Sequence, residues 1–301
     1  MFCGPTSTHY YHAAQQFPKT IYIFVCIFNV LASVSSTLGN IMILFALRKC
    51  QSLHPPSKVL LSSLALTDLF VGLVVLPLFT AYYLTIILEM PTYYCSIAIS
   101  YGRISSFVGS VSLTTIATIA VDRFLAFHLR LRYKEIVKFK RVVCVLVLEW
   151  ILAALWAGSW FWSAKFNLIW GTIALLSFCL ITSLCYLSIH RGLRHHVVQI
   201  HQQANFSESN DFNLLQYKKT VYNMLWICGL LLVCYIPYLS SLLAILITGV
   251  NSSTRFVLHF SAIAINFNSS LNPVLYCWRI KELKEKVTAA FLSLCKFFLS
   301  F

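Results

Sequence analysis

Long apolar stretches separated by short polar segments dominate the chain. A helix needs about 20 apolar residues to cross the hydrocarbon core of a bilayer, whereas a barrel strand shows only about ten residues of alternating polarity. The pattern therefore predicts an all-α fold, a seven-transmembrane helix bundle formed by one domain over residues 20–278. The predicted spans are 20–47, 57–87, 97–127, 141–162, 167–190, 219–248 and 255–278.

The segment after the last span has a different period. Its apolar residues recur at steps of three and four, and Lys281, Lys284, Glu285 and Lys286 lie opposite them. Residues 279–301 are therefore predicted to form an amphipathic helix in the membrane interface, followed by a short cytoplasmic tail. Cys295 near its end is a candidate palmitoylation site, with a free thiol as the plain alternative.

Composition agrees with a membrane protein. The 301 residues are 59% hydrophobic and 11% charged, whereas a soluble domain has about 25% charged residues. One soluble core could not bury so much apolar surface.

The distribution of basic residues predicts the orientation. Most of the 23 Lys and Arg residues fall in three alternate connections and in the tail, and cytoplasmic loops carry such an excess. Residues 1–19 are therefore predicted to be an extracellular N-terminal tail of a multi-pass protein of the plasma membrane. The net charge of +14 then reflects contact with anionic lipid of the bilayer rather than binding of nucleic acid.

Two cysteines and one sequon fall on the predicted outer side. Cys3 and Cys95 are the outer cysteines, and the sequence leaves open whether they pair. Asn251 begins the sequence Asn-Ser-Ser in the third outer loop and is the predicted glycosylation site.

Several polar residues fall inside the predicted spans. An ionisable group there costs at least about 2.5 kcal/mol and usually marks function, so Asp68 is a candidate site residue. The polar residues at comparable depth are Asn40, Ser112, Asn268, Asn272 and Tyr276. Together they could hold water or a small cation, or form a static network that joins helices.

Two further features suit a bundle that changes shape. Asp122 and Arg123 are adjacent at the inner end of the third span, so Arg123 can pair with Asp122 or turn to a new partner. Pro237 and Pro273 lie inside the sixth and seventh spans, where proline bends a helix.

These residues, in this order, resemble the rhodopsin-like, class A G-protein-coupled receptors across all seven helices and the helix that follows. The matched residues are Asn40 in "TLGN", Asp68 in "LALTD", Asp122-Arg123-Phe124, Trp150, Tyr186, Pro237 in "CYIP", and the sequence "NPVLY" from Asn272 to Tyr276. Each motif is weak alone, and their order and placement make the resemblance specific.

The resemblance implies a receptor, not an enzyme, that passes binding of an extracellular ligand to a heterotrimeric G protein. Helix 6 would swing outward at Pro237, and Arg123 would leave Asp122 to meet Tyr186 and Tyr276. Leu131 would contact the G protein beside Arg123. A structural sodium ion at Asp68, with no other cofactor, would bias the resting state; its pocket residues are Asn40, Asp68, Ser112, Asn268 and Asn272.

The ligand is left open. Amine receptors of the family carry an aspartate near Ser105, and retinal receptors carry a lysine near Asn266; both are missing here. The candidate ligand contacts are Ser105, Tyr235, which replaces the family's tryptophan before Pro237, and Arg103. Arg103 could meet an anionic group or only extend to the outer surface.

Two other classes of protein remain as alternatives. A membrane transporter could use Asp68 and Glu149 as ion sites, although the chain shows no inverted repeat. A non-coupling receptor-like scaffold would keep the fold without signalling.

Overall fold

A computed structural model gives the fold. It describes residues 17–51, 53–129, 132–159, 164–203, 209–280 and 282–289, together with Tyr11, Gln15 and Leu292. The described residues form long helices joined by short connections, and no strand occurs among them.

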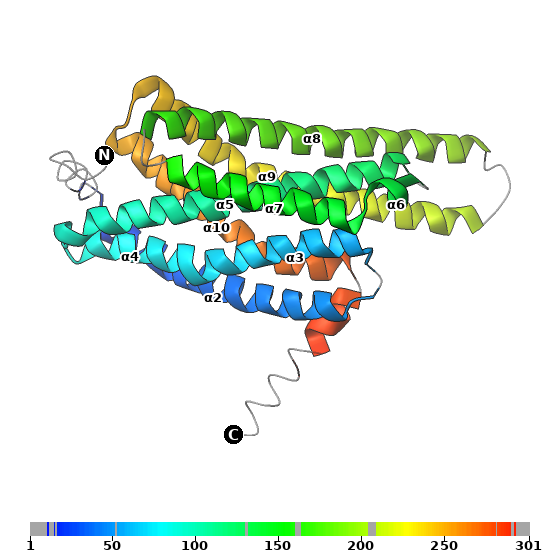
Figure 1. The fold of residues 1–301 in the computed structure, drawn as a ribbon, viewed down its shortest axis with the longest axis horizontal. Helices are drawn as coiled ribbons and strands as arrows, with labels where there is room; N and C mark the ends of the chain where they lie inside the picture. Colours follow the sequence, from blue (N-terminus) through cyan, green and yellow to red (C-terminus); the bar gives the residue numbers. More distant parts are fainter. Residues whose placement is uncertain are drawn as a thin grey trace.

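The long helices run side by side to form the predicted seven-helix bundle (Figure 1). The second span is one continuous rod built from α3, η1 and α4, and a short helix, α6, lies between α5 and α7. The bounds are α2 Lys19–Lys49, α3 Pro55–Phe70, η1 Val71–Val75, α4 Leu76–Ile87, α5 Pro91–Leu129, α6 Tyr133–Ile136, α7 Phe139–Gly158, α8 Ala164–Gln203, α9 Ser209–Thr248 and α10 Ser252–Arg279.

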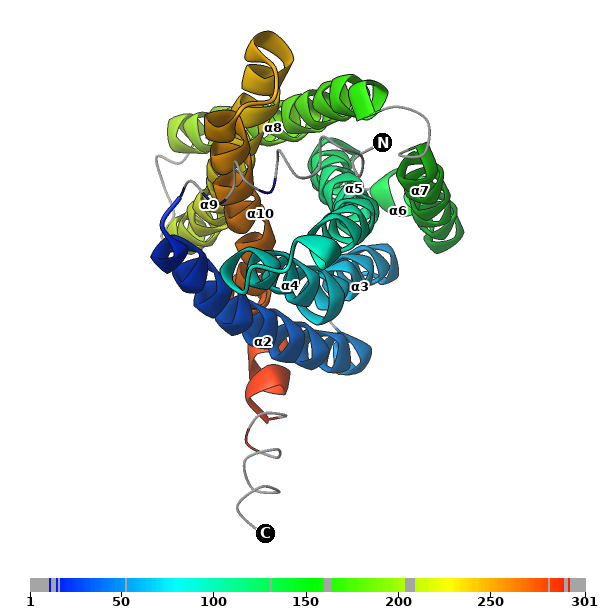
Figure 2. The same ribbon diagram turned by 90° about the vertical axis from the view of Figure 1, so that its left-hand side faces the viewer.

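Seen along the bundle, α10 lies between α9 and α2 and completes a ring of helices (Figure 2). α2 packs against α10 and against the second span, α10 packs against α9, and α9 packs against α8. α5 contacts the second span, α7 and α8. Segments far apart in sequence, such as α2 and α10, are therefore direct neighbours in the bundle.

Polar and apolar residues are distributed as a bilayer requires. Large apolar side chains such as Phe24, Leu31 and Leu155 have more than 60% of their surface exposed, whereas Asn29, Asn40 and Asp68 have none. Apolar side chains facing lipid lose nothing by exposure, and polar groups must find partners inside. Six of the helical segments are also long and apolar enough to cross a membrane.

α10 is not one of those six, because its inward face is polar. It carries Arg255, His259 and three asparagines within its length. Its position between α2 and α9 nevertheless makes it the seventh helix of the bundle.

The fifth and sixth helices are longer than the predicted spans. The predicted spans end at residue 190 and begin again at residue 219, but α8 continues to Gln203 and α9 begins at Ser209, so both helices run past the others at the predicted inner end (Figure 1). After α10, residues 282–289 are helical and turn away from the α10 axis. Leu283 of this helix is fully buried, so part of its apolar face packs on the bundle.

Candidate functional site

The carboxyl group of Asp68 lies at the centre of the bundle, where α3, α2 and α10 meet. Its side chain is fully buried. The Asn272 amide donates a hydrogen bond to Asp68 Oδ2 at 2.6 Å, and Ser269 faces the same carboxyl group. Two residues of "NSSLNP" in the seventh helix therefore compensate the acid of the second helix.

A second set of hydrogen bonds joins α2 to the same place. Ser36 donates to the backbone carbonyl of Asp68 at 2.8 Å, and Asn40 donates to the carbonyls of Ser36 at 2.9 Å and Ser269 at 3.1 Å. The three predicted residues Asn40, Asp68 and Asn272 are thus brought together by one network through α2, α3 and α10.

The network leaves oxygen atoms available for a cation. Asp68 Oδ1, Asn40 Oδ1 and Asn268 Oδ1 are buried and have no hydrogen-bond partner. Carboxylate and amide oxygens are ligands that hard cations prefer, so the residues present fit a sodium ion chemically. Ser112 of α5 is also buried, with 7% of its surface exposed.

The end of α5 that is predicted to lie inside holds an ion pair. Arg123 Nη2 lies 2.8 Å from Asp122 Oδ2, and the same nitrogen donates to the hydroxyl of Ser57 on α3. Tyr133 of α6 donates to Asp122 Oδ1 at 2.6 Å. Of the two arrangements that the sequence allows, the structure adopts the one in which Arg123 pairs with Asp122.

Sequence reasoning missed the roles of Ser57 and Tyr133. Burial, and then the hydrogen bond to Asp122, raise the pKa of the Tyr133 phenol above its usual value. Tyr133 lies two residues after Leu131 in "RLRY", so its place in the inner connection was visible. The sequence did not show that the chain turns back and brings Tyr133 to Asp122.

The other predicted switch residues, Tyr186, Tyr276 and Pro237, pack in different parts of the bundle. Tyr186 of α8 is buried with Ala120 and Ile189 near the inner end of α5. Tyr276 belongs to the main apolar core, which spans several helices. Pro237 lies within the continuous helix α9, beside that core, and its carbonyl accepts hydrogen bonds from Ser240 and Ser241.

The structure gives a physical account of Glu149. This half-buried acid of α7 faces α5, where Thr118 donates to its Oε1 at 2.5 Å and Thr115 donates to its Oε2 at 3.2 Å. Two threonine hydroxyls therefore stabilise the acid at the contact between α7 and α5. These hydrogen bonds are separate from those around Asp68.

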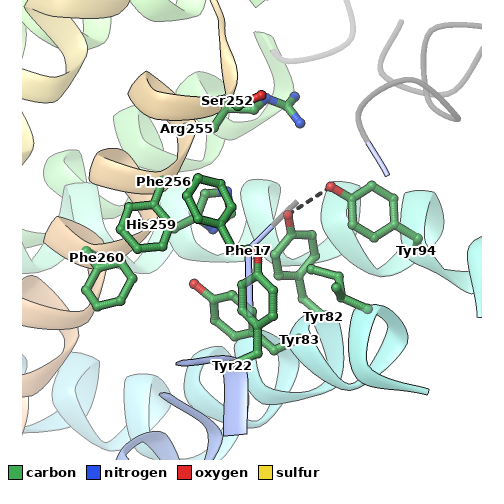
Figure 3. A pocket seen from close by; sticks show the side chains of 11 residues that line it. Phe17, Tyr22, Tyr82, Tyr83, Tyr94, Ser252, Arg255, Phe256, His259 and Phe260 are labelled. Atoms are coloured by element: carbon green, nitrogen blue, oxygen red, sulfur yellow. Dashed lines mark hydrogen bonds between the residues drawn. The ribbon is translucent and has the colours of Figure 1, made fainter. Parts of the chain in front are cut away.

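A small pocket, here called the outer pocket, lies at the end of the bundle that the sequence predicts to be outside, between the start of α10, α4 and the beginning of α2 (Figure 3). It encloses about 30 Å³, which is room for roughly one water molecule. The residues that line it are Phe17, Tyr22, Tyr82, Tyr83, Ile86, Tyr94, Ser252, Arg255, Phe256, His259 and Phe260.

The three predicted ligand contacts lie outside this pocket. Arg103 and Ser105 are half-buried on α5, and Ser105 donates to the Gly102 carbonyl at 3.2 Å. Tyr235 is 7% exposed and packs in the main apolar core. None of the three is among the described residues that line the outer pocket.

The remaining predicted positions are only partly within the described residues. Cys95 forms a disulfide bond. Cys3, the other cysteine on the predicted outer side, lies outside the described residues, as do Leu131 and Cys295. Asn251 is exposed and caps α10 by accepting a hydrogen bond from the Thr254 backbone at 2.8 Å.

Comparison with known proteins agrees with this architecture. Residues 39–161 and 156–276 match the profile of the 7 transmembrane receptor (rhodopsin family). Adenosine receptor A3 of Ovis aries is 23% identical over 288 residues, which cover 85% of this chain and 86% of that receptor. Histamine H2 receptor of Canis lupus familiaris is 24% identical over 267 residues, with 79% and 71% covered.

A solved structure, squid rhodopsin, has the same fold. It superposes with a TM-score of 0.73 at 18% sequence identity and covers 92% of this chain and 87% of its own.

Proposed function

Because the chain belongs to the rhodopsin family of seven-transmembrane receptors, we propose that it converts binding of an extracellular ligand into activation of a heterotrimeric G protein. It would act at the plasma membrane with its N-terminus outside, as the basic inner connections indicate. In the proposed cycle, α9 swings outward at Pro237 and opens the inner end of the bundle.

The arrangement of Arg123 is the observation that supports this proposal best. Arg123 is bound by Asp122 of its own helix and by Ser57 of α3, and Tyr133 holds Asp122 from the other side. A charge held by few, breakable partners at the inner end can change partners when the helices move. In the active state Arg123 would meet Tyr186 and Tyr276, and Leu131 would contact the G protein.

The buried network around Asp68 supplies the bias toward the resting state. We propose that Asp68 holds a sodium ion with oxygens of Asn40 and Asn268, since those oxygens have no partner within the network. Bound sodium supplies positive charge that compensates the carboxylate. Asn272 positions the carboxylate through its amide hydrogen bond.

The test measures G-protein dissociation in cells that express wild type, Arg123→Ala or Arg141→Ala at matched surface levels, across panels of lipids, peptides, nucleosides, amines and aromatic acids. Arg141 is an exposed cation of the inner side whose guanidinium binds only a backbone carbonyl among the described contacts. The proposal expects a wild-type response that Arg123→Ala loses and Arg141→Ala keeps.

Equal responses from wild type and Arg123→Ala would contradict the proposed switch. A surface-expressed wild type that stays silent with every panel would favour the non-coupling scaffold, and sodium-driven uptake by that silent protein would favour a transporter that uses Asp68 and Glu149.

A further inference from the structure

The outer pocket is built from stacked rings. His259 of α10 lies parallel to Tyr82, with centroids 5.2 Å apart and planes at 10°, and Tyr22 stacks on Tyr83 with centroids 5.4 Å apart and planes at 28°. Such offset stacks favour flat aromatic partners. The Tyr82 and Tyr94 hydroxyls are hydrogen-bonded to each other at 2.9 Å, so the wall they form is held in place.

One ring in the pocket does not come from the helices. Phe17 precedes α2 and stacks on Phe256 of α10, with centroids 4.3 Å apart and planes at 18°. Tyr11, which also precedes α2, lies edge-on against Tyr94 with centroids 5.3 Å apart. Because only about 30 Å³ stays open, Phe17 fills the space that a ring-sized ligand would need.

The charged group that lines the pocket is positive. Among the described residues that line it, Arg255 is the one permanently charged group, and no acidic residue is present. Arg255 and Ser252 lie at one edge of the group of aromatic side chains (Figure 3). A guanidinium in such a place recognises carboxylate or phosphate and disfavours a cationic ligand.

We propose that this pocket binds a small planar aromatic acid, whose ring replaces Phe17 against Phe256 and whose acid group meets Arg255. Phe17 is then a built-in occupant that the ligand displaces. The role of this pocket as a receptor site rests on the proposed function. Binding of the acid to the pocket does not require a G protein.

The experiment measures binding to full-length receptor in lipid nanodiscs. The probes are indole-3-acetate, indole-3-acetamide and tryptamine, which share one ring and differ in charge. The proteins are wild type, Phe17→Ala, Arg255→Gln, Arg255→Lys, Arg103→Gln, and the matched control Lys165→Gln, which removes an exposed outer cation that does not line the pocket. Thermal unfolding of each protein without probe verifies folding.

The proposal expects the acid to bind more tightly than the amide and the amine. Phe17→Ala should bind the acid about tenfold more tightly than wild type, because a site that is no longer self-occupied gains apparent affinity. Arg255→Gln should lose about tenfold for the acid and little for the amide, with partial recovery in Arg255→Lys.

Three results would overturn the proposal. The first is equal affinity of wild type and Arg255→Gln for the acid. The second is a loss of affinity for the acid in Arg103→Gln and not in Arg255→Gln. The third is that no probe binds Phe17→Ala up to about 1 mM. If binding follows the expected pattern while G-protein dissociation stays absent, the site stands and the proposed signalling function fails.

Discussion

Asp68 places a charge inside a spanning helix, and its two carboxylate oxygens have different surroundings. A charged side chain in a spanning helix costs at least about 2.5 kcal/mol, and its Oδ2 recovers part of that from the Asn272 amide. Its Oδ1 has no partner. A network that satisfies one oxygen and leaves the other available suits reversible binding of a cation better than static joining of helices.

Asp68→Asn tests that role. The substitution keeps the shape and removes the charge, so we expect basal and agonist-driven signalling to become the same in sodium and in a large organic cation. G-protein dissociation in the two salts measures this. An unchanged sodium response in the variant would show that the ion acts elsewhere.

Tyr133 makes a second prediction at this scale. Tyr133→Phe removes the hydroxyl that donates to Asp122 and frees that carboxylate from one constraint. A hydrogen bond to a charged group contributes about 1.5–3 kcal/mol, so the resting state should weaken and basal G-protein activation should rise several-fold at matched surface level. Equal or lower basal activity would place the Tyr133 contact outside the switch.

At the scale of elements, the second span depends on close contact with α2. Pro77 has no amide hydrogen, and the chain accommodates it with the π-helical turn η1 just before it. Within that turn, the Gly72 carbonyl accepts a hydrogen bond from Ser33 of α2 at 2.6 Å. A Cβ at Gly72 would lie 2.6 Å from Thr37 Oγ1 and 2.9 Å from the Thr37 backbone nitrogen.

Gly72→Ala should therefore push α2 away from the second span. Overpacking of this kind costs about 1–3 kcal/mol, so we expect a lower midpoint of thermal unfolding in detergent and less protein at the cell surface. Gly109→Ala is the matched control, because a Cβ there meets no atom within 4 Å. The explanation fails if both variants unfold at the same temperature.

At the scale of the whole molecule, orientation decides which end meets the ligand. The loop between α9 and α10 should lie outside, and Asn251 in that loop is exposed. The Asn251 side chain also caps α10, so its replacement would disturb the helix as well as the sequon.

Ser253→Ala removes the glycosylation sequon and keeps the cap. We expect the mature receptor from cells to migrate faster on a gel than wild type and to match deglycosylated wild type. Asn205→Gln, which alters a sequon on the predicted inner side, should change nothing. A wild type without glycan at Asn251 would contradict the proposed orientation or the use of this site.

Sequence reasoning found the pair Asp122-Arg123 and the buried acid Asp68 because both break a strong pattern. Asp68 and the pair Asp122-Arg123 interrupt apolar helices at recognisable places, and a charge in such a helix points to function. Ser57, Tyr133 and Phe17 were missed because each lies in or beside a polar segment, where similar residues are common. Their importance comes from partners 65, 11 and 239 positions away in sequence, Asp122 for the first two and Phe256 for the third.

The sequence by itself determined the helical class, the number of spans and the family, because each span must bury or expose its own side chains and satisfy its own backbone in a bilayer. Only the tertiary structure decided which side chains meet. It placed Asn272 against Asp68, Arg123 against Ser57, and Phe17 in the outer pocket. Helix periodicity sets the face on which a residue lies, but the packing of seven helices sets the partner that this face meets.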